Sequence, residues 1–287
     1  MTNEQIDDIH KRLTLKVAKY IKAIIQEYGK FIPKERLSYL GNINYDEIIQ
    51  IYDYGNINGL ANPKHILLPL NAEKALEKIK TLPGYGSDPS HQTYDQATAI
   101  INDNTFETYV NHAIVTGMTL EQYFEDLLLH ETMHFCGSDG GNALKEGINE
   151  YLTRKLALKK GFHTNGCAYP KEVKIAHTLE SILGEEVITQ IAFIKPYDKV
   201  LSYLETTLGK DASELYQNVT HAMDEEFYNR YYRHMNHFDG LEGIQEKVTN
   251  YKQIDYSKVE QIIEQYQKTE SSQNKNSSAK VKLTSQH

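Results

Sequence analysis

The sequence predicts an α+β fold, with a small mixed sheet in the first half of the chain and helices filling the second. Two observations predict this class. Short apolar runs separated by Gly, Asn and Pro lie between residues 30 and 118, the usual pattern of strands and turns. From Thr119 onward, apolar residues recur at helical spacing between glycine or proline breaks. The sheet is therefore expected to precede a mostly helical half.

The first half is expected to begin with an amphipathic helix from Ile6 to Tyr28 that ends near Gly29. A second helix is expected around Ala72 to Lys80. Four apolar runs are the expected strands: Ile48 to Tyr52, Ile66 to Leu70, Ala97 to Ile101 and Tyr109 to Val115. An edge strand such as Thr105 to Ile114 is a candidate to pair with an extended peptide.

The helical half is divided by turn-forming residues. The expected breaks fall at Gly137 to Gly141, Gly161 to Pro170, Gly184, Pro196, Gly209 and Gly240 to Gly243. Residues 269–287 are Ser, Asn, Gln and Lys with almost nothing apolar, which predicts disorder. We therefore divide the chain into an N-terminal α+β subdomain at 1–137, a helical subdomain at 138–268 and a disordered tail at 269–287.

Composition excludes several classes of function. The 287 residues carry 31 Lys plus Arg against 39 Asp plus Glu, a formal charge of −8, which argues against a nucleic-acid partner. Cys136 and Cys167 are too few for a disulfide framework. The acidic start is unlike a signal peptide, and no apolar run approaches the ~18 residues of a membrane span. We expect a soluble cytoplasmic protein with no membrane span, the alternative being delivery without a cleavable signal.

One motif carries chemistry. His130-Glu131-Thr132-Met133-His134 is an HExxH sequence near the end of a helix that Thr119 and Gln122 open as a capping box. The two histidines are one turn apart on the apolar face, so both imidazoles are expected to point inward and to share one Zn²⁺. Glu131 lies about 100° round the helix, where it is placed to take a proton from a metal-bound water.

A third ligand is expected on the next helix. Asn142 is its expected N-cap and Gly161 its expected end. Glu146 and Glu150 lie one turn apart on one face, opposite the apolar stripe. One is placed to bind the metal and the other to support a ligand, although the same pattern also fits two solvated surface carboxylates.

HExxH followed by a helix that reads Leu-Lys-Glu-Gly-x-x-x-Tyr-Leu resembles the glutamate-zincin metallopeptidases (gluzincins). The resemblance is to the aminopeptidase-like and minimal members and covers residues 127–156, a tenth of the chain. It implies a zincin-like fold, zinc as the cofactor, and Glu146 as the third metal ligand with His130 and His134. Gly147 also fits, because a residue without Cβ lets two helices approach closely around a small ion.

Other ligands remain as alternatives. The Asn-Glu pair that ends at Glu150 resembles the one in thermolysin-like enzymes, in which that Glu binds the metal. HExxHxxG also begins a metzincin pattern, but its last ligand position is Gly140, which leaves the neighbouring Asp139 as a further alternative. Cys136 lies on the same turn as the second histidine and is expected to be a small buried residue.

The predicted function is zinc-dependent hydrolysis of peptide bonds in a peptide or protein, by a metal-activated water with Glu131 as general base. The oxyanion needs a further donor. The candidates are His163, Tyr169, His177, His221 and the cluster from Tyr228 to His237. Two alternatives stand beside this function: a catalytically inactive zincin-like binding or regulatory module, and a metal-dependent hydrolase of a non-peptide amide.

Overall fold

The computed structural model describes residues 1–53, 59–81, 83–87, 117, 119–162, 169–230, 251 and 253–284. The first half contains helices α1 (Asn3–Tyr28), α2 (Lys34–Leu40) and α3 (Ala72–Ile79), a 3-10 turn η1 (Tyr45–Glu47) and a three-stranded sheet. Among these residues, no helix is long and apolar enough to cross a membrane.

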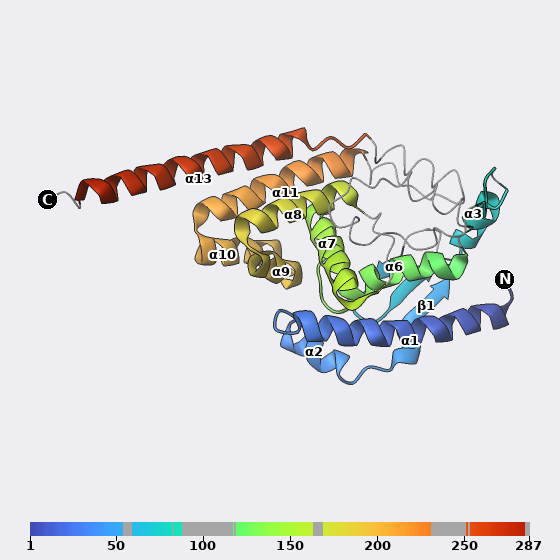
Figure 1. Ribbon diagram of the computed structural model, residues 1–287. Coiled ribbons are helices and arrows are strands. Elements are labelled where there is room, and N and C mark those ends of the chain that lie inside the picture. Colours follow the sequence, from blue (N-terminus) through green and yellow to red (C-terminus); the bar gives the residue numbers. More distant parts are fainter. Residues whose placement is uncertain are drawn as a thin grey trace.

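The sheet is small and mixed. Its order is β1 (Ile49–Tyr52), β3 (Ile66–Pro69) and β2 (Leu60–Ala61), with β1 parallel and β2 antiparallel to the central strand. Every residue of β3 is buried, as a continuous apolar run requires of a strand covered on both faces. In Figure 1 the strands lie between α1 and α6 (Leu120–Phe135), and both helices pack against the sheet.

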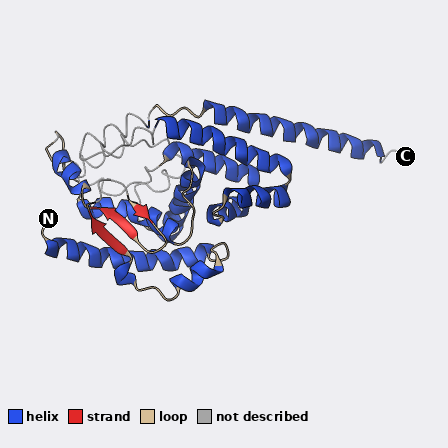
Figure 2. Ribbon diagram, turned by 180° about the vertical axis from the view of Figure 1, so that it is seen from behind, coloured by secondary structure: helices blue, strands red, loops and turns tan. Residues whose placement is uncertain are grey.

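The second half is helical, as expected. Its described helices are α7 (Ala143–Lys160), α8 (Pro170–Leu183), α9 (Glu185–Phe193), α10 (Tyr197–Leu208), α11 (Lys210–Arg230) and α13 (Ser257–Thr284). α7 is the central helix, because it packs against α6, α8, α9 and α11 (Figure 1). Gly184 and Gly209 lie between consecutive helices with φ of 96°, a conformation that favours glycine. Figure 2 shows the strands confined to the part of the molecule near the N-terminus.

These observations confirm the α+β class and the predicted elements that fall on described residues. The expected strands at Ala97 to Ile101 and Tyr109 to Val115, and the edge strand at Thr105 to Ile114, lie outside the described residues. Two short elements, α2 and β2, carried no pattern that predicted them. One set of core side chains includes residues from both halves, and the division at residue 137 stays a prediction.

The C-terminal segment differs from its prediction. Residues 269–284 continue α13 as helix, where the sequence predicts disorder. The first half of α13 packs on α11 and buries apolar side chains such as Val259. The polar stretch therefore extends a helix that is already formed, which avoids the free-energy cost of helix nucleation. The hydroxyls of Thr269, Ser271 and Ser272 then donate to carbonyls one turn back. The helix extends beyond α10 and α11 in Figure 1.

Candidate metal centre

The two histidines of the HExxH motif lie on α6. This helix begins and ends where the sequence predicts. Thr119 and Gln122 form a complete capping box at its start. After Cys136, the chain turns away at Gly137, where φ is 118°. The side chains of His130 and His134 are only 10% and 12% exposed. Both imidazoles therefore point inward, as expected.

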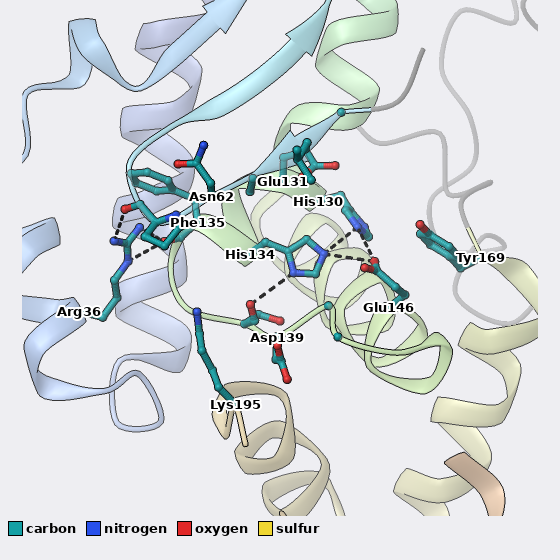
Figure 3. A pocket seen from close by; sticks show the side chains of 17 residues that line it. Arg36, Asn62, His130, Glu131, His134, Phe135, Asp139, Glu146, Tyr169 and Lys195 are labelled. Carbon is teal, nitrogen blue, oxygen red and sulfur yellow. Dashed lines mark hydrogen bonds and ion pairs between the residues drawn. The ribbon is translucent and has the colours of Figure 1, made fainter. Parts of the chain in front are cut away.

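The structure brings the three predicted metal ligands together. Nε2 of His130 and Nε2 of His134 are 3.1 Å apart. Oε2 of Glu146, in the first turn of α7, lies 3.3 Å and 3.2 Å from these two nitrogens (Figure 3). Asn142 positions this carboxylate, because its side chain caps α7 by accepting from the backbone N–H of Lys145. Among the described residues, these three form the group that can hold a metal ion.

The opposite nitrogen of each imidazole has a partner that only accepts hydrogen bonds. Nδ1 of His130 lies 2.8 Å from Oε2 of Glu150, and Nδ1 of His134 lies 3.4 Å from the carbonyl oxygen of Ser138. Both Nδ1 atoms therefore carry the proton, and in a neutral ring the lone pair is on Nε2. Two nitrogen lone pairs and a carboxylate oxygen then face one another, an arrangement that either a metal ion or a proton on an imidazole can satisfy.

The donor distances also fit zinc. Zinc lies about 2.0–2.2 Å from nitrogen and oxygen ligands, so the edge of a tetrahedral site is about 3.3–3.5 Å. The three observed separations, 3.1 Å, 3.2 Å and 3.3 Å, are close to this edge. Three protein ligands also leave a fourth position open, as catalytic zinc sites do. The residues present therefore fit a zinc ion.

The charges of the site are strongly coupled. Burial by itself raises the pKa of Glu146, but the adjacent imidazoles of His134 and His130 lower it to about 2. Burial opposes charge on His130, but hydrogen bonds with Glu146 and Glu150 raise its pKa well above the ordinary value. Without an ion, the carboxylates thus hold a proton on the imidazole. A bound metal displaces that proton, so metal binding is expected to weaken as the pH falls.

Glu131 lies beside the metal ligands, on the side of the sheet (Figure 3). It is 7% exposed, and burial raises its pKa, while His130 and His134 oppose the shift. The backbone of Ala61 in β2 donates to its carboxylate. A Cβ on Gly59 would lie 2.9 Å from Oε1 of Glu131, so the backbone before β2 approaches the carboxylate closely. β2, which the sequence did not reveal, therefore holds the candidate base.

The alternative ligands have other partners. Glu150 is 2% exposed and bridges His130 and Arg154, with Oε1 2.8 Å from Nε of the arginine. It therefore supports a ligand, one of the two roles expected for this pair, and neither glutamate is a solvated surface carboxylate. The carboxylate of Asp139 lies 3.8 Å from Nζ of Lys145. Cys136 is fully buried in the core, as expected.

Gly147 has a different role from the one expected. A Cβ at this position would lie 2.6 Å from Cβ of Glu172 and 2.7 Å from its backbone. The glycine therefore allows α7 and α8 to approach closely. The partner helix, α8, carries none of the three candidate metal ligands. The physical reason is rotation: Glu146 faces the metal site, and the next residue points about 100° away.

The site opens into a cleft of about 380 Å³. Of the described candidates for an oxyanion donor, Tyr169 lines it. Its ring stacks on His130 at 5.7 Å between centroids, and in Figure 3 its hydroxyl points toward the metal ligands. Tyr169 precedes α8 with φ of 51°, a strained conformation for a tyrosine.

The other candidate donors lie elsewhere. His177 contacts Tyr151, His221 stacks on Tyr197, and Tyr228 is 63% exposed. His163 and residues 231–237 lie outside the described residues. Two cleft residues, Arg36 and Lys195, were not predicted, because each is a single cation on a segment without a motif. No family model, curated protein or solved structure matches this chain.

Proposed function

We propose that this chain is a zinc-dependent metallopeptidase of the zincin type. The observation that carries the proposal is the convergence of His130, His134 and Glu146, whose ligand atoms lie within 4.8 Å of one another. The protonated Nδ1 atoms direct both Nε2 lone pairs to the same point. A structural zinc site with four protein ligands has no use for the adjacent buried Glu131, whereas hydrolysis requires a base there.

The roles follow from position. When bound, zinc supplies Lewis acidity, which lowers the pKa of water and polarises a carbonyl. Glu131 accepts the proton of the attacking water and returns it to the leaving amine, a role for which its buried position beside the metal ligands is suited. Tyr169 donates from across His130 to the developing oxyanion. Glu150 fixes the tautomer and orientation of His130.

The test compares the wild type with Glu131→Gln, using zinc content and hydrolysis of peptide libraries. We expect the wild type to bind one zinc ion per chain and to cleave peptides. Glu131→Gln is expected to bind zinc equally and to lose at least about 100-fold in kcat, the contribution of a general base. Equal cleavage by both proteins would refute the role of Glu131. Zinc binding without cleavage of any peptide by the wild type would refute the peptidase proposal.

A further inference from the structure

The cleft beside the metal ligands has a cationic end. Arg36, from α2, and Lys195, which follows α9, both line the cleft (Figure 3). In that view both lie on one side of His134, opposite Tyr169. Among the described residues, neither cation has a carboxylate within ion-pair distance. Unpaired cations that line a cleft are natural contacts for an anion.

Arg36 is held in place and still has donors to offer. Its Nε and Nη2 donate to the carbonyl of Phe135 at the end of α6, and Nη1 donates to the carbonyl of Pro63 at 2.6 Å. Its guanidinium also stacks on the rings of Tyr39 and Phe135. These contacts use three of the five N–H groups, so one on each terminal nitrogen remains for a ligand. A guanidinium with a fixed position suits a planar carboxylate.

The net charge at this end is positive. Asp139 also lines the cleft, but Nζ of the buried Lys145 lies 3.8 Å from its carboxylate. The formal charges of these two residues cancel, which leaves those of Arg36 and Lys195. Lys195 is exposed, so its ammonium can move toward a ligand with little loss of packing.

A second cavity next to the cleft is lined by carboxylates. It has a volume of about 520 Å³, shares Gly140 and Glu146 with the cleft, and is also lined by Asp224 and by Glu225, which forms an ion pair with Lys258. The carboxylate of Asp224 makes this cavity less favourable for an anion than the cationic end of the cleft. An anionic group bound beside the metal ligands is therefore expected to lie toward Arg36 and Lys195.

We infer that Arg36 and Lys195 form a subsite for a substrate carboxylate, so that the enzyme prefers peptides with an anionic group on this side of the scissile bond. The carboxylate has two possible sources, the C-terminus of the peptide and an acidic side chain. This inference rests on the proposed function for the position of the scissile bond. It does not need catalysis to be tested, because binding of a carboxylate can be measured directly.

The test measures binding of labelled tetrapeptide pools by fluorescence anisotropy. Three randomised pools are compared: one with a free C-terminal carboxylate, one amidated and free of acidic residues, and one amidated with a fixed glutamate. The Glu131→Gln background keeps bound peptides intact. Each measurement is made with and without zinc, because a carboxylate can also ligate the metal.

At least one anionic pool is expected to bind about tenfold more tightly than the neutral pool, the size of a charge-assisted contact, with and without zinc. The anionic pool that binds more tightly shows whether the carboxylate comes from the C-terminus of the peptide or from an acidic side chain. Lys195→Met is expected to remove most of the preference. Lys199→Met is the matched control, because Lys199 is exposed on α10 and does not line the cleft.

Equal binding of all three pools would overturn the inference, as would a preference that survives in Lys195→Met. Arg36→Lys keeps the charge and loses the planar donors, so a folded variant with a reduced preference supports the subsite. A carboxylate preference in a wild type that cleaves nothing would refute the proposed function and leave the subsite intact. Cleavage of peptides by the wild type with no preference for the anionic pools would support the proposed function and refute the subsite.

Discussion

Replacing Glu150 by glutamine tests how the metal site is supported. In the wild type, its carboxylate accepts from Nδ1 of His130 at 2.8 Å. Hydrogen bonds to a charged group contribute about 1.5–3 kcal/mol, and those to a neutral amide about 0.5–1.5 kcal/mol. The variant keeps a neutral acceptor, so the expected loss is about 1–2 kcal/mol. This corresponds to zinc binding about 5- to 30-fold weaker than in the wild type.

The assay is competition for zinc against a chromophoric chelator, with circular dichroism to confirm that the variant is folded. Folding needs this check because Arg154, which is 1% exposed, loses its ion pair with Glu150. Glu146→Gln is the reference, because it replaces a direct ligand. Wild-type affinity in folded Glu150→Gln would refute the supporting role. A loss as large as that of Glu146→Gln would make Glu150 a ligand itself.

Three further predictions follow from other contacts. Gly140→Ala is expected to weaken zinc binding at least about tenfold, because its Cβ would lie 2.4 Å from Oε1 of Glu146. Gly141→Ala, whose Cβ meets its nearest atom at 3.5 Å, should bind normally in the same chelator titration, and equal affinities would refute the steric argument. Tyr251→Phe removes a donor from the buried Glu172 and should lower the unfolding free energy by about 1–3 kcal/mol in urea titrations. Burial already raises the pKa of Glu172, and this variant raises it further, so stability is lost as the pH rises and the deficit should be larger at about pH 8 than at about pH 5. The opposite pH trend would contradict this prediction. Zinc should raise the Tm of the wild type and leave that of His134→Ala unchanged in calorimetry, because ligation stabilises the folded state alone. An equal rise in both would contradict a site at His134.

Local patterns predicted the elements that carry the metal ligands. The capping box at Thr119 and the N-cap at Asn142 each fix where a helix begins, and the positions of His130, His134 and Glu146 follow from counting turns. Short-range hydrogen bonds decide these features, so the sequence shows them. The role of Glu150 was predictable as one of two options for the same reason, since it lies one turn from Glu146 on the same helix.

The rest of the site depends on contacts between distant segments. β2 has two residues, too few for any period, and it forms because β3 and α6 lie beside it. Arg36 reaches the cleft because the end of α6 offers it a carbonyl 99 residues away along the chain. The partner of Gly147 on α8 is a product of helix packing as well. None of these contacts leaves a local signal, so tertiary structure was needed to find them.

The most direct test of the metal centre is the zinc content of the purified protein, measured by elemental mass spectrometry. The wild type is expected to contain one zinc ion per chain, and both His134→Ala and Glu146→Ala are expected to lose it. Loss of zinc in His134→Ala but not in Glu146→Ala would mean that the third ligand is a residue other than Glu146. A wild type that binds no metal when zinc is offered would contradict the metal centre and the peptidase proposed from it.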